Sequence, residues 1–563
     1  MSELLTALAL IFIAAGALLL VANHFSLPTV PFLLLAGLLT GPFIEPALLL
    51  ELAQWGIAFL VFVFGVKLDL RSVVTLAREA EVVAGIQLLV VGALGFGVGI
   101  ALGYDDLNAL YLSIAAALSS TIVGAGLLQE EIRENLVHGR LAQSIHFVQD
   151  LVAIVLVLML SADAFTADAI SSGLGYGVIF LAVAYVINAH LFTPVSRLAD
   201  GSQELLMIGS ISILIAFLAA AELAGVSIVV GAFAAGLAIE RDFTRNLGML
   251  NGIESITDFF VAVFFVTIGA LVLIETPDLT VLVTAGLLIV ITALVKPAIT
   301  LATILWEGYE SRTATLTSVS LDQVSEFALI IAIEAFILGL MVPELFQAVI
   351  LAAAVTMVTA SYTRRNDDRI HRLLTRAGFQ SPHVKTDERS RVDDSLVDHV
   401  VIVGYGRQAR RLVETVDERS IPYVVIENDP TMLSPLQRNC RNFVFGDAMN
   451  EYTWEKARVQ EASLVVSTTS QPRISERVLS LDVDADVILR APTAREASAL
   501  LDRGALYVSV PDLLAADSLL ARVREIAEDP SARDRLRGHH LEDLREFERM
   551  GFASMSEDVE RRG

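Results

Sequence analysis

The sequence predicts a polytopic α-helical membrane domain followed by a cytoplasmic α/β domain of Rossmann-like type. Of the 563 residues 55% are hydrophobic and 18% are charged, whereas an ordinary soluble protein carries about 25% charged residues. Up to about residue 363 the chain runs in apolar blocks, and from Arg364 onward charges crowd in. We therefore expect the following division of the chain: a transmembrane domain at 1–363, a charged linker at 364–397, the Rossmann-like domain at 398–515 and a charged helical tail at 516–563.

The apolar blocks predict thirteen spans, most of which are long enough on their own to cross a bilayer. They lie near 4–22, 29–43, 47–66, 80–103, 107–128, 142–161, 170–191, 203–222, 225–240, 255–274, 280–305, 313–337 and 340–362. From the second loop onward the loops alternate in charge: one set carries Lys or Arg, such as Arg71 and Arg140, and the other set carries acids and no Lys or Arg, such as Asp105 and Glu344. Basic loops stay in the cytoplasm. The N-terminus is therefore expected outside the cell membrane and the C-terminal domain inside.

Two properties of the whole chain restrict its partners and its compartment. The net charge of −24 argues against nucleic acid as a partner. The single cysteine, Cys440, allows no internal disulfide, which suits a soluble part in the reducing cytoplasm. Membrane lipid is the expected surrounding of the first part.

Four predicted spans carry polar residues near mid-membrane. Asp150 lies about eight residues, or about 12 Å, beyond the cytoplasmic start of its span, near the centre of a core of about 30 Å. The other polar positions are Ser119, Ser120 and Thr121 in the fifth span, Lys296 in the eleventh, and Asp322, Gln323, Ser325 and Glu326 in the twelfth. A charge at this depth costs about 2.5–3.5 kcal/mol, so such groups face a cavity or one another.

These residues allow two interpretations. Lys296 and Glu326 can form a structural ion pair between helices, which is compatible with transport. Asp150, with the Gln149 amide beside it, is interpreted as functional, because a lone buried carboxylate can exchange a proton for a cation. We expect Asp150, Gln149, Lys296 and Glu326 to carry the chemistry.

The polar breaks of the fifth and twelfth spans lie seven spans apart. Discontinuous helices in corresponding positions of inverted repeats indicate a transport site. Ser119, Thr121 and freed backbone carbonyls are then candidate ligands for K⁺ or Na⁺, with Asp150 and Gln149 completing the site.

The stretch DHVVIVGYGRQARRLVETVDERSIPYVVIENDP predicts strand, glycine turn, helix and second strand. In this context the GxGxxA pattern indicates a nucleotide site. Gly404 permits the tight turn, and Gly406 lets a phosphate approach the helix N-terminus. Ala409 keeps the helix close to the sheet, and Glu427 can accept from ribose hydroxyls. The VGYG letters also occur in potassium-channel filters, but they follow a strand in the soluble part, so no filter is expected here.

Several motifs together resemble the monovalent cation:proton antiporter-2 family, and within it the glutathione-gated potassium efflux (Kef) branch. They are FVQDLVAI, LSSTIVGAGLL, GVSIVVGAFAAGLAIE, FFVAVFFVTIGALV and SLDQVSEFALII. The resemblance implies a sodium/proton-antiporter fold with a dimer domain, a moving core domain and crossed broken spans. It implies that Asp150 is the exchanged carboxylate and, with Gln149 in place of a second acid, that exchange is electroneutral. Asp322 replaces a small residue of the family, which implies a more acidic cytoplasmic funnel.

The soluble part resembles a regulator-of-potassium-conductance (TrkA-N) domain. That likeness implies homodimers and bound AMP or NAD(H), and it allows for an ancillary cytoplasmic regulator. The implied contacts are Gly404, Tyr405, Gly406, Arg407, Ala409, Glu427, Asp447, Ala448 and Thr468. A domain that has kept its fold without a ligand is the alternative.

The sequence as a whole favours a secondary antiporter of K⁺ more than Na⁺, gated by nucleotide, and not an enzyme. A nucleotide-gated cation channel remains the alternative function, although no membrane filter is present in the sequence. The tail is interpreted either as a docking helix or as a solvated one.

Overall fold

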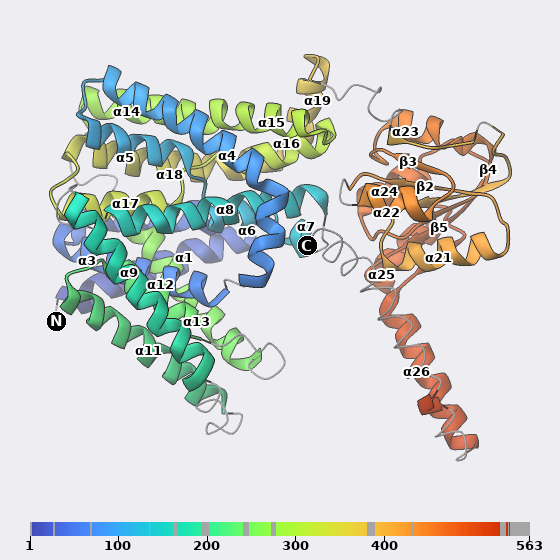
Figure 1. Ribbon diagram of the computed structural model, residues 1–563, viewed down its shortest axis with the longest axis horizontal. Helices are drawn as coiled ribbons and strands as arrows, with labels where there is room; N and C mark the ends of the chain where they lie inside the picture. The colour runs from blue at the N-terminus through green and yellow to red at the C-terminus, as the bar shows by residue number, and fades with distance from the viewer. Residues whose placement is uncertain are drawn as a thin grey trace. The chain divides into compact units, whose positions relative to one another are not determined.

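The structure is a computed structural model (Figure 1). It describes residues 3–25, 29–67, 70–133, 136–160, 167–192, 202–239, 247–271, 277–379, 389–393, 395–429, 432–529, 536–538 and 540. Contacts divide the chain into two compact units. The first consists of Met1–Glu307 and Ser311–Phe379, and the second of Gly308–Glu310 and Gln380–Gly563.

The described residues of the first unit form helices and their connections. The α-helices are α1 (Glu3–His24), α2 (Thr29–Thr40), α3 (Pro46–Lys67), α4 (Leu70–Ala101), α5 (Asp106–Ala117), α6 (Thr121–Leu127), α7 (Gln129–Arg133), α8 (Val137–Leu160), α9 (Ala167–Val186), α11 (Gln203–Ala224), α12 (Ile228–Leu237), α13 (Leu247–Leu271), α14 (Leu279–Val290), α15 (Lys296–Glu307), α16 (Ser311–Val319), α17 (Glu326–Ile337), α18 (Pro343–Arg365) and α19 (Asp367–Arg376). Shorter elements are the 3-10 turn η1 (Gly41–Phe43) and the π-helical segments η2 (Ile187–Phe192) and η3 (Ile291–Val295).

Each of the thirteen predicted spans coincides with a helix or with a pair of helices. Within the described ranges, eight helices are long and apolar enough to cross a membrane, and four shorter apolar helices accompany them. The first unit is therefore a multi-pass membrane domain, while the total of thirteen spans stays a prediction. The stretch 364–397, predicted as a linker, contains the helix α19.

The helices of the first unit pack as two groups (Figure 1). We call α4 to α8 and α14 to α18 the core group, since these helices pack chiefly on one another. We call α1 to α3, α9 and α11 to α13 the frame group for the same reason. The polar residues singled out in the sequence all belong to the core group.

Two close backbone contacts hold the frame group together. Helix α2 meets α13 at Gly37 and Gly269, and α3 meets α12 at Gly65 and Gly236. A Cβ atom on Gly37 would collide with the carbonyl oxygen of Val266, and one on Gly236 would collide with a backbone carbonyl of α3. Glycine is therefore required at these crossings. The reciprocal pairing of α2 with α13 and α3 with α12 is the arrangement that inverted repeats produce.

The second unit contains a six-stranded parallel sheet in the order β3-β2-β1-β4-β5-β6. Its strands are β1 (His399–Val403), β2 (Tyr423–Glu427), β3 (Phe443–Phe445), β4 (Ala462–Ser467), β5 (Asp486–Arg490) and β6 (Tyr507–Ser509). Its helices are α21 (Arg407–Glu418), α22 (Leu433–Asn439), α23 (Glu451–Lys456), η5 (Val459–Glu461), α24 (Pro472–Leu479), α25 (Ala494–Asp502) and α26 (Pro511–Glu528). Every residue of β1 is buried, as expected of a parallel strand covered on both faces. This strand order is that of the Rossmann fold and confirms the predicted fold class. Residues 541–563 of the predicted tail lie outside the described residues.

Candidate ion-exchange and nucleotide sites

Two predicted spans are broken, as their polar residues indicated. Residues 118–120 separate α5 from α6, and residues 320–325 separate α16 from α17. A serine caps the second half of each pair: Ser120 Oγ accepts from Val123 N at 3.2 Å, and Ser325 Oγ accepts from Phe327 N at 3.0 Å. A hydroxyl at this position satisfies an amide that the helix leaves free. Both breaks therefore begin a new helix inside an apolar domain.

The two breaks are equivalent in detail. The residue before each capping serine donates its backbone N–H to the next long helix of the core group. Ser119 N donates to Gln149 Oε1 of α8 at 2.9 Å, and Val324 N donates to Thr356 Oγ1 of α18 at 3.1 Å. Gln149 and Thr356 therefore correspond. Gln149 is followed by Asp150 in α8, whereas Thr356 is followed by Met357 in α18. The acid at this position therefore occurs in the first repeat and not in the second.

Lys296 links the two breaks through their backbones. Its ammonium Nζ donates to Leu118 O at 2.9 Å and to Gln323 O at 2.8 Å. Each carbonyl lies two residues before a capping serine, so Lys296 joins equivalent positions of the two repeats. The side chain is fully buried. The interpretation of Lys296 and Glu326 as an ion pair is not supported, since no such pair occurs among the described residues and the ammonium binds carbonyls instead.

Asp150 is buried, and one of its two carboxylate oxygens is free to bind a ligand. Its Oδ2 accepts from Thr121 Oγ1 at 2.8 Å. Glu326 Oε1 accepts from Ile122 N, an amide of the first turn of α6, at 3.1 Å. Asp150 Oδ1, Gln149 Nε2 and Glu326 Oε2 are among the buried polar atoms of the described residues that lack a hydrogen-bond partner. Buried polar groups are rarely left unpaired unless a ligand or water completes them.

A cavity of about 710 Å³ connects Asp150 with the surface. Thr121, Asp150 and Glu326 line it, together with residues of α2, α3, α13 and α18. Its wall also includes Gly126 and Gln129, which are exposed at the end of the unit where α6 finishes. The cavity therefore connects Asp150 with this end of the unit.

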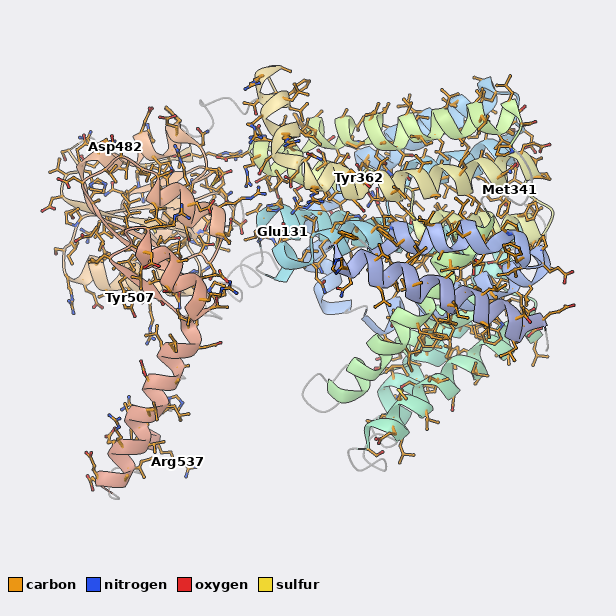
Figure 2. The ribbon with its side chains drawn as sticks, turned by 180° about the vertical axis from the view of Figure 1, so that it is seen from behind. Glu131, Met341, Tyr362, Asp482, Tyr507 and Arg537 are labelled. Carbon is orange, nitrogen blue, oxygen red and sulfur yellow. The ribbon has the colours of Figure 1, made fainter. Side chains whose placement is uncertain are left out.

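The same end of the unit is marked by an ion-pair cluster at the close of α18. Arg364 pairs with Glu131 and with Asp367. Figure 2 shows Tyr362, near the end of α18, and Glu131 on the same side of the unit, with Met341, which precedes the start of α18, at the opposite end. The charge pattern of the loops predicts that this end is cytoplasmic.

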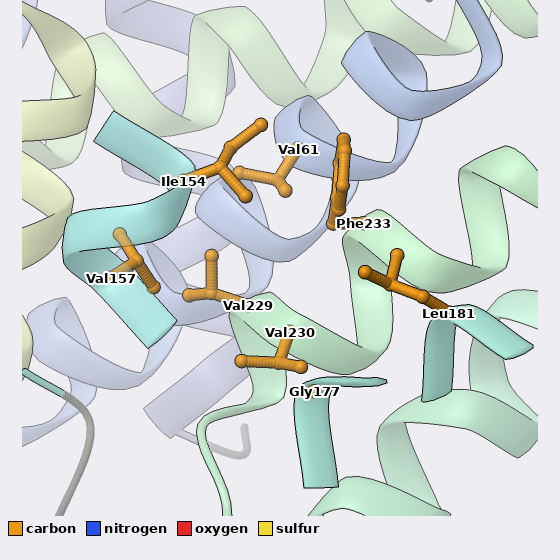
Figure 3. Close-up of a pocket in the computed structure, with 8 residues that line it drawn as sticks. All are labelled: Val61, Ile154, Val157, Gly177, Leu181, Val229, Val230 and Phe233. Atoms are coloured by element: carbon orange, nitrogen blue, oxygen red, sulfur yellow. The ribbon is translucent and has the colours of Figure 1, made fainter. Parts of the chain in front are cut away.

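On the other side of Asp150 the two helix groups meet through apolar side chains. Ile154 and Val157 lie one and two turns beyond Asp150 on α8, and they face α12 at Val229, Val230 and Phe233 (Figure 3). The cavity between them measures about 10 Å³, which is at the lower limit for a single water molecule. We call these five residues the apolar seal.

Two polar residues of the core group, Gln87 and Asp322, have contacts that the sequence did not indicate. Gln87 of α4 is buried; its Nε2 donates to Ala117 O at 3.3 Å, and its Oε1 accepts from Thr300 Oγ1 at 3.2 Å. An amide inside the apolar block EVVAGIQLLVV was the available signal. Asp322 does not line the cavity, contrary to the expectation of a more acidic funnel. It accepts from Thr363 Oγ1 at 2.5 Å.

Ser119, predicted as a cation ligand, connects the two helix breaks instead of lining the cavity. Its Oγ donates to Leu321 O at 3.1 Å and so connects the two breaks. The oxygen keeps lone pairs for a cation, but Ser119 does not line the cavity, whereas Thr121 does.

In the second unit, the predicted nucleotide contacts gather at the carboxyl edge of the sheet. Gly404 follows β1, Glu427 ends β2, Asp447 follows β3 and Thr468 follows β4. Gly404 has φ +85°, a conformation that favours glycine. Thr468 Oγ1 donates to Val403 O at 3.0 Å. Ligands of open α/β sheets bind at this edge, at the point where the strand order reverses.

Glu427 organises the glycine loop through its backbone. Its Oε2 accepts from Tyr405 N at 2.7 Å, and its Oε1 accepts from Asn428 N at 2.8 Å and Asp429 N at 2.9 Å. Burial raises the pKa of this carboxyl group, and the amides of Tyr405 and Asp429 oppose that shift. Three of the about four lone-pair positions of the Glu427 carboxylate are thus occupied, and one remains to accept from a ribose hydroxyl.

The remaining predicted contacts have different surroundings. Ala409 is fully buried in α21, as a residue that packs the helix on the sheet would be, and the space around Gly406 is open. Asp447 Oδ1 accepts from Met449 N at 2.9 Å. Ala448 is buried. Arg407 begins α21, and its side chain lies outside the described residues.

Comparison with known families agrees with this architecture. The family "Sodium/hydrogen exchanger, transmembrane" matches residues 8–364, and the TrkA-N domain family matches residues 400–511. A candidate cation/proton antiporter, YbaL of Escherichia coli (strain K12), is 27% identical over 550 residues, which is 91% of this chain and 95% of YbaL. The glutathione-regulated potassium-efflux system protein KefC of Enterobacter sp. (strain 638) is 27% identical over 484 residues, 82% of this chain and 75% of KefC.

Solved structures give likenesses of smaller extent. A crystal structure of the TrkA-N domain of the inner membrane protein ybaL from Escherichia coli is 29% identical, with a TM-score of 0.22, and covers 23% of this chain and 97% of that chain. A GsuK channel structure bound to NAD is 17% identical, with a TM-score of 0.20, and covers 41% of each chain. These scores add nothing to the family match, which spans most of the chain. The chain belongs to the transmembrane sodium/hydrogen exchanger family and carries a TrkA-N domain in its second unit.

Proposed function

We propose that this protein exchanges a monovalent cation for a proton at Asp150 by alternating access. One observation carries the proposal: a buried carboxylate with a free oxygen lines a cavity that reaches one end of the unit and is sealed from the other. A proton or a cation can occupy the same oxygen, and a change in the packing of core group against frame group would expose it to the second side.

The site contains suitable ligands for a cation. Asp150 Oδ1 and Glu326 Oε2 are unpaired oxygens in the described structure, and Thr121 Oγ1 touches Asp150. Carboxylate and hydroxyl oxygens are the ligands that hard cations prefer. Gln149 orients the first break, and Lys296 holds both breaks in place. Lys296 is therefore a positioning residue, which acts through the backbone carbonyls.

We propose that exchange is electroneutral, with one cation for one proton. The residue beside Asp150 is the neutral Gln149, and the residue of the second repeat that corresponds to Asp150 is Met357. A single exchanged carboxylate binds either one proton or one monovalent cation, so its net charge is the same in both loaded states. We propose K⁺ as the cation, on the basis of the relatives named potassium-efflux systems, with Na⁺ as the alternative.

The second unit is proposed to bind AMP or NAD(H) and to regulate exchange. The glycine loop, Glu427, Asp447 and Thr468 at one edge of the sheet support this role. A nucleotide that binds one arrangement of a domain pair more tightly would bias the membrane unit. A homodimer in the cell membrane, with the second unit in the cytoplasm, is part of the same proposal, as is an ancillary cytoplasmic regulator.

The test is cation-driven proton movement in proteoliposomes that enclose a pH-sensitive dye. K⁺, Na⁺, Rb⁺ and Li⁺ are added to the full-length protein, with and without AMP, NAD⁺ or NADH. Asp150→Asn keeps an oxygen that can accept from Thr121, so it should fold normally and lose exchange. Asp105→Asn, at the N-cap of α5, is the matched control and should keep exchange.

Two results would count against the proposal. Exchange that persists in Asp150→Asn would remove this residue from the mechanism. Cation currents that do not depend on the pH gradient would favour the alternative function, a nucleotide-gated channel.

A further inference from the structure

A hydrogen bond joins the core group to the frame group on the sealed side of Asp150. Ser227, the N-cap residue of α12, donates from Oγ to Glu334 Oε2 of α17 at 2.8 Å. Helix α12 belongs to the frame group and α17 to the core group.

The position of this bond along α17 is informative. Glu326, Phe327 and Ile330 of α17 line the large cavity, and Glu334, one turn farther on, is not part of its wall. Glu334 lies eight residues after Glu326, which corresponds to about 12 Å along the helix. The bond therefore lies beyond the closed end of the cavity.

Ser227 also lies next to the apolar seal. Val229 and Val230, which face α8, follow it in the first turn of α12. Separation of α12 from the core group would open the seal and would at the same time break the bond between Ser227 and Glu334. One movement thus affects both features.

The geometry of the cap fixes the direction of the bond. Ser227 Oγ accepts from Val229 N at 3.2 Å, so this lone pair is occupied and the hydroxyl hydrogen is available for Glu334. The capped helix can remain intact when the bond to Glu334 breaks, because the acceptor half of the hydroxyl is used within α12.

We propose that Ser227 and Glu334 form a latch that closes the second access route to Asp150. The latch stabilises the arrangement in which the large cavity is accessible, and it opens when the core group moves to expose Asp150 on the other side. This inference rests on the proposed exchange function, which requires both openings.

Removal of the latch should shift the balance between the two arrangements by about tenfold. A tenfold change corresponds to about 1.4 kcal/mol, which is of the order expected for one hydrogen bond to a charged group. The shift should favour the arrangement in which the apolar seal is open to water.

The experiment measures water access to the seal with a single cysteine. Cys440 is the one cysteine of the chain, so Cys440→Ser provides a background for Val157→Cys in α8. The full-length protein is placed in lipid nanodiscs, and the rate of reaction with a charged maleimide is recorded. Val157 is buried, so the reaction is expected to be slow in this parental protein.

Three latch variants and one control distinguish the latch from general loosening. Ser227→Ala and Glu334→Leu should each raise the labelling rate about tenfold, and Glu334→Leu leaves the α12 cap in place. Glu334→Gln keeps an acceptor for Ser227 and should label at close to the parental rate. Ser212→Ala, in α11, removes a hydroxyl that donates to Ile208 O of its own helix and should have no effect.

Unchanged labelling in both Ser227→Ala and Glu334→Leu would overturn the latch, as would an equal rise in Ser212→Ala. Labelling does not require ion movement. Absence of exchange in the unmodified protein would therefore refute the proposed function separately, and the labelling rates would still decide whether Ser227 and Glu334 keep the seal closed.

Discussion

Lys296 offers a direct test of how the two broken helices are held. In the variant Lys296→Met, Leu118 O and Gln323 O would lose their donor while remaining buried. A hydrogen bond from a charged group contributes about 1.5–3 kcal/mol, so two such bonds amount to about 3–6 kcal/mol. Methionine removes a buried charge, and the saved cost of desolvation offsets part of this loss. A net decrease of about 2–4 kcal/mol in the stability of the membrane unit is expected.

The assay is thermal unfolding of the full-length protein in detergent, followed by loss of the monodisperse species in size-exclusion chromatography. The midpoint for Lys296→Met should fall by several degrees. Asp150→Asn is the comparison, because it keeps an acceptor for Thr121 and should change the midpoint little. An unchanged midpoint in Lys296→Met, combined with loss of exchange, would refute the holding role and would assign Lys296 to the chemistry of transport.

Three further predictions concern packing, the glycine loop and pH. Gly236→Ala should lower the midpoint and the yield of folded protein because its Cβ collides with the backbone of α3, whereas Gly286→Ala, whose Cβ meets nothing within 4 Å, should not. Glu427→Gln offers one acceptor oxygen to three amides, so the free energy of unfolding of the second unit in urea should fall by about 1–3 kcal/mol. An unchanged urea midpoint would contradict the hydrogen bonds of Glu427 described above. Burial lowers the pKa of His399. The unfolded chain therefore binds a proton first, and stability should fall as the pH drops below about 6.5; His399→Gln should flatten this slope, and an equal slope in both proteins would exclude the histidine as its cause.

The polar residues of the membrane unit were predictable because they interrupt apolar blocks. Ser119 to Thr121 and the segment from Asp322 to Glu326 lie at breaks of helices, and Asp150 lines a cavity. The partners of Lys296 were not predictable, because backbone carbonyls leave no mark in the sequence. An ion pair with Glu326 was the available guess, and Leu118 O and Gln323 O take its place.

Long-range contacts explain most of what the sequence did not indicate. Gly37 and Gly269 meet across more than two hundred residues, and single glycines in apolar helices are too common to signal such a contact. The hydrogen bond of Glu334 was equally hard to predict, since its partner Ser227 lies in another helix group. The Rossmann-like unit was easier because its signal is local: strand, glycine turn and helix follow one another directly. Even there, the use of Glu427 by its own backbone was visible only in three dimensions.

The correspondence between Gln149 and Thr356 has one more consequence. Both halves of the membrane unit retain the side chain that anchors a helix break, but the neighbouring position holds an acid in one half and a thioether in the other. A duplicated architecture has thus kept its scaffolding twice and its charge once. Because the equivalent position of the other half, Met357, holds no acid, the proposed exchange requires that Asp150 itself be exposed to each compartment in turn.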